Sequence, residues 1–381
     1  MSKTLYYLTY QDFPSNKANS HQTIATCKYF QRNKHNVTLL FPLRSQKSNA
    51  DLEIIKSFYE MKEDSFKIIG LPYNYKFENK KFFKKINYVY KHILWSYKTV
   101  EEVTKKFKKP DIFFTRSEWI FYFISRKNLK VVYECHKLTT LRRFILTKVI
   151  KKENSKIIFL NHNLKVDSGI KIKYFHKTLV QHSGYDEDYF YTSKIKKKKQ
   201  VIYAGSIYRL GKNRDLDFVI NAFKDSRLSQ YNLKIFGGTE EEIKELRKLV
   251  TNSDSIEINS RISKKQLGQE LSNSEIGILT SYDDEVSKKY TDPLKFYEYA
   301  GSGLKILAVD FPSHRALDKY CNLIFYDKNN IESFINAVLS STSFKLNHNN
   351  YDVIPTQNDR IKSIINFIYE ARLEGLDPPT L

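Results

Sequence analysis

Short apolar runs alternate along the chain with segments whose apolar residues recur at helical spacing. In the first half, each strand-like run is followed by helical or loop sequence, an order typical of parallel sheets in α/β proteins. The expected strands are 5–10, 37–41, 112–115, 131–134 and 157–160, and the first helix is expected over about 20–33. We therefore predict a first α/β domain over residues 1–192.

A second series of the same kind follows a lysine-rich stretch. Residues 193–200 carry a run of lysines without apolar periodicity, which predicts a linker. The expected strands after it are 201–205, 233–236, 256–259, 276–280 and 304–309, and the expected helices are 215–223, 240–250, 264–272, 331–339 and 358–374. The sequence thus predicts a second α/β domain over residues 201–357, followed by a terminal amphipathic helix.

The sequence from Thr291 to Gly303 predicts a helix whose N-terminus is open. Thr291 or Asp292 can cap this helix, and Pro293 fits its first position because no donor is lost there. Gly301 and Gly303 supply a left-handed stop. The helix lies in a β-α-β series, and ligands of such sheets bind at the ends of strands and helices.

Such a helix N-terminus is suited to an anion. The backbone N–H groups of Leu294 and Lys295 are expected to be unpaired, beside the positive end of the helix dipole. Glu298 lies one turn further on the same face, where a carboxylate can accept two hydrogen bonds from a diol such as a ribose. A diphosphate and a diol together describe a nucleotide. The alternative is an ordinary helix between two strands, with Glu298 as a solvated carboxylate.

Length and charge narrow the class of protein. The 381 residues are enough for two domains, and 41% hydrophobic with 14% aromatic residues indicates a globular chain. The 64 basic and 42 acidic residues leave a net charge of +22, which favours anionic partners. The lysines are spread over helix faces and the linker, without an RNA-binding aromatic sheet motif or a zinc knuckle, so we expect no nucleic-acid partner.

Cysteine usage and the N-terminus indicate a cytoplasmic protein. The three cysteines are far apart in sequence, which favours neither a disulfide framework nor a zinc site. No histidine has a partner at metal-ligand spacing, so no metal is expected. No apolar run approaches the ~20 residues needed to span a bilayer, and the first strand lacks the apolar region of a signal peptide.

Residues 79–95 predict a helix with an apolar stripe flanked by lysines. The stripe consists of residues 82, 83, 86, 89, 90, 93 and 94. This pattern suits an interfacial helix on anionic lipid, which would make the protein peripheral on the inner face of the cell membrane. An ordinary core-packing helix with a solvated lysine face is equally consistent with the pattern.

Several motifs, taken in order, resemble the donor half of glycosyltransferase family 4, the retaining enzymes of the GT-B fold. These motifs are Gly205-Ser206 with Lys212-Asn213, the sequence 234–238, and Asp292-Pro293-Leu294-Lys295 followed by Glu298. The N-terminal half agrees more loosely, through residues 14–20, 131–136 and 183–190. The resemblance covers nearly the whole chain and is strongest over 201–317.

The resemblance implies an α/β architecture of two Rossmann-like parallel-sheet domains that face a cleft. The terminal segment 358–381 would cross back and complete the N-terminal domain, and the C-terminal domain would hold the donor. The implied reaction moves a sugar, with retention, from a nucleotide-diphosphate sugar to a saccharide or lipid-linked acceptor in surface polysaccharide or glycoconjugate synthesis. The nucleotide-sugar is a substrate, so no cofactor is implied.

The resemblance also implies roles for individual residues. His136 would contact the transferred sugar, Glu298 the ribose, and Lys212 the diphosphate leaving group. The implied donor-binding residues are Gly205, Ser206, Arg209, Lys212, Asp292, Pro293, Leu294, Lys295 and Glu298. Because preorganised cations and dipoles can stabilise the departing diphosphate, no metal is required. A histidine at a strand end and a lysine in a loop are also common as structural or solvent-facing residues.

The chain departs from the family pattern at three places. Tyr290 stands where the first of two glutamates is common, and Ser206 stands where an arginine is common. The usual glycine-rich loop after the first strand is replaced by a sequence that contains Asn16, Lys17 and Asn19, which we expect to contact donor or acceptor. A nucleotide-sugar epimerase of the GT-B fold makes the same donor contacts and stays an alternative, which a requirement for a separate acceptor would exclude.

Overall fold

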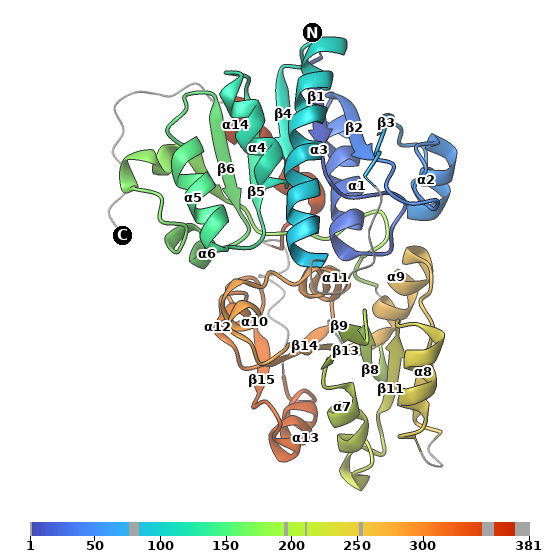
Figure 1. Cartoon of the computed structure of the whole chain (residues 1–381). Coiled ribbons are helices and arrows are strands. Elements are labelled where there is room, and N and C mark those ends of the chain that lie inside the picture. The colour runs from blue at the N-terminus through green and yellow to red at the C-terminus, as the bar shows by residue number, and fades with distance from the viewer. Residues whose placement is uncertain are drawn as a thin grey trace. The chain divides into compact units, whose positions relative to one another are not determined.

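The chain forms two compact α/β units (Figure 1). The computed structural model describes residues 2–75, 84–193, 197–209, 212–250, 254–344 and 354–369. The first unit contains the chain up to Gln181 and the segment that begins at Asp359, and the second unit runs from His182 to Asn358. Both units have a parallel sheet with helices, as the sequence predicts.

The first unit is built on a seven-stranded sheet of order β3-β2-β1-β4-β5-β6-β7. Its strands are β1 (Thr4–Leu8), β2 (Asn36–Pro42), β3 (Lys67–Leu71), β4 (Ile112–Thr115), β5 (Val131–Cys135), β6 (Ser155–Phe159) and β7 (Thr178–Val180). All strand pairs are parallel, with Leu5 beside Val37 on one side and Ile112 on the other. The helices are α1 (Ala18–Arg32), α2 (Leu52–Tyr59), α3 (Lys84–Lys106), α4 (Glu118–Arg126), α5 (Thr140–Val149), α6 (His162–Val166) and α14 (Gln357–Tyr369), with a 3-10 turn at Ile172–Lys177.

Strand β1 shows how both faces of this sheet are covered. Leu5 and Tyr7 are fully buried in a core that also contains Ile361 of α14. Tyr6 points to the opposite face, where its ring meets Phe113 edge-on with 5.8 Å between ring centroids. Because successive side chains of a strand point to opposite faces, a parallel strand covered on both sides reads as a continuous apolar run.

Helix α14 crosses back to the first unit, as predicted. Ile361 and Ile364 are fully buried in the core of that unit. The ammonium of Lys156 on β6 donates to the carbonyl of Ile368 at 3.2 Å, which ties the last turn of the helix to the sheet. The predicted end of this helix at residue 374 lies outside the described residues.

The second unit is built on a six-stranded parallel sheet of order β12-β11-β8-β13-β14-β15. Its strands are β8 (Lys198–Ala204), β11 (Asn232–Phe236), β12 (Ile256–Asn259), β13 (Ser274–Leu279), β14 (Lys305–Val309) and β15 (Leu323–Tyr326), and a small antiparallel hairpin is formed by β9 (Tyr208–Arg209) and β10 (Lys212–Asn213). The helices are α7 (Leu216–Ala222), α8 (Glu240–Arg247), α9 (Lys264–Asn273), α10 (Glu285–Tyr290), α11 (Leu294–Gly301), α12 (Pro312–Arg315) and α13 (Ile331–Ser340), with a 3-10 turn at Ser226–Leu228. The strand order reverses at β1 in the first unit and at β8 in the second, and ligands of doubly wound sheets bind beyond the carboxyl ends of the strands at such a point.

The lysine-rich stretch differs from the predicted linker. Strand β8 begins at Lys198, inside the predicted linker 193–200, and the units divide earlier, after Gln181. The ammonium of Lys197 donates to the carbonyls of Ser302 at 2.9 Å and Ser274 at 3.1 Å, so this lysine is bound by protein rather than solvent. Burial lowers its pKa to about 8. At Lys197 and in β8, the lysine-rich sequence is therefore part of the second unit rather than a linker.

Candidate functional site

The N-terminus of α11 has no side-chain cap. Pro293 is the N-cap residue, one position before the place predicted for it. The carboxylate of Asp292 instead accepts hydrogen bonds from the backbone N–H of Ser183 and the hydroxyl of Tyr297, both at 2.7 Å. The prediction that Thr291 or Asp292 caps this helix is therefore wrong, because a segment distant in sequence takes up the carboxylate. The first amides of the helix consequently have no side-chain acceptor among the described residues.

At the end of α11, the left-handed stop predicted for Gly301 and Gly303 is found at Gly303 only. Gly303 adopts a φ of +70°, a left-handed conformation that favours glycine. Gly301 is the last residue of the helix, and a Cβ there would lie 2.6 Å from the ring of Tyr185. Gly301 is therefore required for close packing, and Gly303 for the turn.

The side chain of Lys295 lies beneath Gly205, at the carboxyl end of β8. Its Nζ is 3.6 Å from the centroid of the Tyr203 ring. A Cβ on Gly205 would lie 2.3 Å from the Cε of Lys295, so only glycine leaves room for this lysine. Nζ is buried and has no hydrogen-bond partner in the described part of the chain. Burial, followed by the positive charge of Arg214, holds the pKa of Lys295 well below its usual range.

Arg214 is a second cation at this place, and the sequence analysis did not identify it. Its backbone N–H donates to the carbonyl of Ile207 at 3.0 Å, which closes the loop that carries the β9–β10 hairpin. Its guanidinium carbon lies 5.5 Å from the centroid of the Tyr282 ring. Its Nε is buried without a hydrogen-bond partner among the described residues. Two like charges thus lie near each other with unsatisfied donors, an arrangement that an anion would stabilise.

Glu298 lies one turn along α11 from Lys295, as predicted. Burial raises the pKa of Glu298, while the charges of Lys264 and Lys295 oppose that rise. Arg261 is the other cation whose field reaches this carboxylate. The negative charge of Asp186 also raises the pKa of Glu298. A half-buried carboxylate can accept hydrogen bonds from hydroxyl groups of a ligand. Lys264 and Arg261 come from α9 and the segment before it, so no local motif marked them.

The remaining donor-side residues lie around the same strand end. Ser206 follows Gly205, and its carbonyl accepts a hydrogen bond from the Tyr203 hydroxyl at 2.7 Å. Arg209 and Lys212 face each other in the β9–β10 hairpin as paired backbone positions. The side chains of both residues lie outside the described part of the structure.

A second candidate site is a polar pocket of about 280 Å³ in the first unit. It is formed where β1, β4 and β5 end, and His136, Lys17 and Asn19 are among the residues that line it. Asn16, which the sequence analysis grouped with Lys17 and Asn19, is not part of its lining. The pocket also contains Arg116, which no motif had indicated.

His136 follows β5 and is held by a buried carboxylate. Its Nε2 lies 2.8 Å from Oε1 of Glu134, which is fully buried. Arg116 donates to both oxygens of the same carboxylate, at 3.0 and 3.3 Å. Burial and the charge of Arg116 lower the pKa of His136, although Glu134 opposes this effect. The predicted functional histidine at this strand end therefore lies between a buried carboxylate and an arginine. Its role stays a prediction.

The opposite wall of the pocket combines paired charges with aromatic rings. Arg44 is paired with Asp12, and Arg44 also lies 4.5 Å from the centroid of the Tyr10 ring. The Tyr10 ring stacks on His92 with 4.0 Å between centroids. Nε2 of His92 lies 2.8 Å from the Ser117 hydroxyl. Because the Tyr10 and His92 rings are both buried, the pocket offers a ligand polar groups of both charges, which can bond to the hydroxyl groups of a saccharide.

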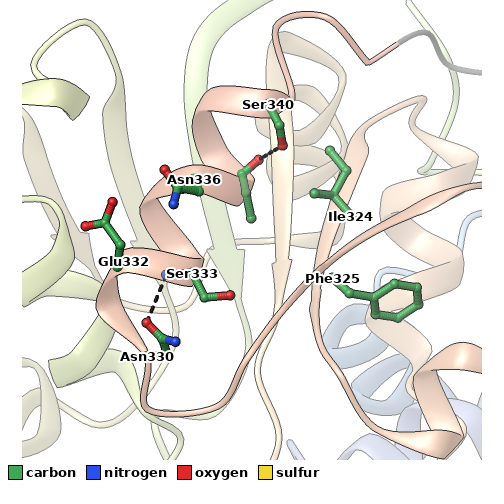
Figure 2. Close-up of a pocket in the computed structure, with 8 residues that line it drawn as sticks. Ile324, Phe325, Asn330, Glu332, Ser333, Asn336 and Ser340 are labelled. Atoms are coloured by element: carbon green, nitrogen blue, oxygen red, sulfur yellow. Dashed lines mark hydrogen bonds between the residues drawn. The ribbon is translucent and has the colours of Figure 1, made fainter.

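A further hollow, of about 530 Å³, lies beside α13 and β15 (Figure 2). Its polar lining serves the helix itself, since Asn330 caps α13 through the N–H of Ser333 at 3.0 Å and Ser340 donates to the Ala337 carbonyl at 3.0 Å. The one carboxylate in its lining, Glu332, is paired with Arg227 at 2.7 Å. We assign no anion-binding role to this hollow, because no positively charged side chain lines it.

Helix α3 contains the predicted apolar stripe, which is exposed in its first described part. Ile86 is 69% and Tyr90 61% exposed, whereas Trp95 and Val100, further along the helix, are buried. The stripe is therefore exposed at residues 86, 89 and 90 and half-buried at Ile93 and Leu94, so both interpretations of the stripe stay open. The start of the predicted segment, residues 79–83, lies outside the described residues.

None of the described helices is both long and apolar enough to cross a membrane. No group of three His, Cys, Asp or Glu side chains in the described ranges is arranged to hold a metal ion.

Comparisons with known proteins indicate a family for part of the chain and a fold for all of it. Residues 187–343, which include the β9–β10 hairpin and α11, match the family model of glycosyl transferases group 1. No curated protein sequence matches the chain.

Three of the similar solved structures indicate the fold. The HepE protein of Anabaena, solved with UDP and glucose, is 10% identical at a TM-score of 0.59, with 97% of this chain and 96% of that chain covered. The lipopolysaccharide outer core galactosyltransferase WaaB is 14% identical at a TM-score of 0.61, with 96% and 99% covered. Sucrose-phosphate synthase of Thermosynechococcus elongatus is 11% identical at a TM-score of 0.61, with 96% and 95% covered. With the family match over 187–343, the chain is a glycosyltransferase enzyme of the GT-B fold.

Proposed function

We propose that the protein is a retaining transferase of the family 4 type that moves a sugar from a nucleotide-diphosphate sugar to a saccharide or glycolipid acceptor. The observation that carries the proposal is a pair of buried donor atoms that lack acceptors among the described residues, Nζ of Lys295 and Nε of Arg214, beside the uncapped N-terminus of α11. Helix amides and cations together form a site for a diphosphate. The UDP and glucose bound to the HepE structure support the same ligand class.

In this proposal the C-terminal unit binds the donor through its diphosphate and its ribose. Lys295, Arg214 and the amides of α11 contact the diphosphate, together with Lys212 of the β9–β10 hairpin. Glu298 accepts the ribose hydroxyls. The departing nucleotide gains negative charge in the transition state, so cations fixed before the reaction lower its barrier.

The pocket of the N-terminal unit contributes the remaining chemistry. His136, which lines this pocket, contacts the transferred sugar. Lys17 and Asn19 extend the lining with hydrogen-bond donors. The acceptor is a saccharide or a lipid-linked saccharide, as in surface polysaccharide or glycoconjugate synthesis.

We also propose that the reaction requires no metal, because Lys295, Arg214 and Lys212 neutralise the leaving group. Excess EDTA should then leave turnover unchanged. A loss of turnover that is restored by Mg²⁺ or Mn²⁺ would contradict this part of the proposal.

The outward face of α3 favours action at a membrane. Its exposed Ile86 and Tyr90 would enter the interface of an anionic leaflet, and the net charge of +22 would strengthen the attraction. We therefore propose a cytoplasmic protein that is peripheral on the inner face of the cell membrane.

A binding screen followed by product analysis tests the function. Thermal shift and calorimetry with nucleoside diphosphates, and then with their sugars, should identify one base and one sugar. The donor found should be consumed faster with lipid extracts or oligosaccharides as acceptor, and NMR of the product should show the anomeric configuration of the donor. No binding of any nucleoside diphosphate would refute the donor site, and inversion at the anomeric carbon would refute the family 4 assignment.

A further inference from the structure

Glu134 is the centre of a buried charge cluster that joins three elements of the first unit. Arg116, after β4, donates to its Oε1 at 3.0 Å, and Arg360 of α14 donates to the same oxygen at 2.6 Å. His136, after β5, places Nε2 at 2.8 Å from that oxygen. Glu134 and Arg360 are both fully buried. We call these four residues the Glu134 cluster.

The cluster determines which ring nitrogen of His136 carries the proton. The two arginines overcome the effect of burial and hold the pKa of Glu134 well below its usual range, so this carboxylate is ionised at neutral pH. An ionised carboxylate only accepts hydrogen bonds. Nε2 of His136 must therefore be the donor, and Nδ1 bears the lone pair when the ring is neutral.

The same cluster keeps the imidazole neutral. Burial and the positive charges of Arg116 and Arg360 lower the pKa of His136, against the single negative charge of Glu134. The side chain is still 27% exposed, because His136 lines the pocket of the first unit. A neutral ring with a free lone pair can accept a hydrogen bond from a hydroxyl group, but it cannot neutralise a phosphate.

Arg360 has no place in the lining of this pocket. It lies on α14, is fully buried, and also places its Nη1 at 3.4 Å from the Thr26 hydroxyl of α1. Its effect on a ligand is therefore exerted through Glu134 and His136. The terminal helix thus contributes a charge to the candidate site as well as apolar surface to the core.

We propose that Glu134 and Arg360 are positioning residues that hold His136 as a neutral Nε2–H tautomer, so that Nδ1 accepts a hydrogen bond from a hydroxyl of the bound sugar. The sugar contact rests on the proposed function, whereas the tautomer and the coupling to α14 do not. The competing interpretation is a structural ion pair that only anchors α14 to the sheet. In that case Arg360 affects stability but not the state of His136.

Histidine NMR of the full chain, labelled with ¹⁵N in its imidazole rings, separates these interpretations. The signal of His136 is assigned from its loss in His136→Gln. The wild type should show the Nε2–H tautomer, and Arg360→Gln should raise the pKa of His136, because one of the cations that disfavour its protonated form is removed. The control Arg32→Gln breaks an ion pair with Asp64 of the same unit, at 2.6 Å, and should leave the His136 titration unchanged.

Two results overturn the inference. One is an Nδ1–H tautomer of His136 in the wild type, which is decisive even if Arg360→Gln does not fold. The other is a folded Arg360→Gln with an unaltered His136 titration. Arg360→Lys, which keeps the charge, should restore a titration close to wild type if charge rather than packing is responsible.

Kinetics with the donor identified by the binding screen test the sugar contact. In Arg360→Gln the acid limb of kcat should move to higher pH, and a shift of about one unit lowers kcat about tenfold below that limb. A uniform loss at all pH values would support the structural interpretation and contradict ours. If no nucleotide sugar is turned over but the NMR results hold, the proposed function fails while the tautomer assignment stands.

Discussion

Replacement of Arg214 by alanine is the most direct test of the donor site. The Nε of Arg214 and the Nζ of Lys295 are buried donors without partners among the described residues, beside an uncapped helix. If a diphosphate binds there, its oxygens supply the missing acceptors. Arg214→Ala should therefore weaken the binding of nucleoside diphosphates and of inorganic pyrophosphate, which carries the anion without the base.

Two opposing effects determine the size of the loss. A hydrogen bond to a charged group contributes about 1.5–3 kcal/mol, which corresponds to roughly 10- to 150-fold in Kd. The charge of Arg214 also disfavours the protonated form of Lys295 in the free protein. Its removal lets Lys295 hold its proton more readily, which offsets part of the loss. We therefore expect about a tenfold increase in Kd, near the lower end of that range.

Calorimetry in two buffers of different ionisation enthalpy measures both effects. The pKa of Lys295 is lowered in the free protein, and a bound anion raises it, so binding should take up protons between the two pKa values. The heat of binding should then depend on the buffer in the wild type, and less so in Arg214→Ala. The matched control is Arg227→Ala, which removes a surface arginine paired with Asp225 and Glu332 in the same unit.

Unchanged affinity of folded Arg214→Ala for pyrophosphate would remove Arg214 from the anion site. An equal loss in Arg227→Ala would show that long-range charge, and not a built site, attracts the anion. Proton uptake that is the same in wild type and Arg214→Ala would refute the coupling between Arg214 and Lys295.

Three further predictions follow from the structure. Glu298→Gln should cost about 1–3 kcal/mol in nucleotide affinity while pyrophosphate binds as before, and equal losses for both ligands would contradict the ribose contact. Burial lowers the pKa of His92 to about 4, so the unfolded chain binds a proton that the folded chain excludes, and stability should fall between pH 6.5 and 4. Urea unfolding should show that His92 contributes up to about 3 kcal/mol to this loss, a contribution that is absent in His92→Asn. Ile86→Glu should weaken sedimentation with anionic vesicles at low salt, whereas Ile172→Glu, at a residue that is 81% exposed elsewhere in the unit, should not.

The parallel sheets were predictable because their strands are buried on both faces and carry continuous apolar runs. The helix after Pro293 was predictable from its local sequence, and so was the turn at Gly303. The cap was not, because Asp292 bonds to Ser183, whose nearness depends on the folded unit. Local propensity at a helix end gives way to a tertiary hydrogen bond when the carboxylate is buried.

The candidate sites, too, were only partly predictable from the local sequence. Lys295 and Glu298 were found because they share one helix with a recognisable start. Arg214 follows Lys212 by two positions in the sequence. Its nearness to Lys295, and the lack of a hydrogen-bond partner for its Nε among the described residues, depend on how the loop folds. The stripe on α3 has the period of a packing face, yet the helix is buried through Trp95. Helical periodicity identifies an apolar face without identifying what covers it.

The position of α14 has a consequence for the order of folding during synthesis. The second unit is one continuous stretch, whereas the first unit lacks α14 until residues 357–369 have been made. Domains fold as units while the chain emerges, usually from the N-terminus onward. Here we expect the unit synthesised second to reach its native state first. Until Arg360 leaves the ribosome, the Glu134 carboxylate has only Arg116 and His136 beside it, and the apolar sites of Ile361 and Ile364 stay open to chaperones.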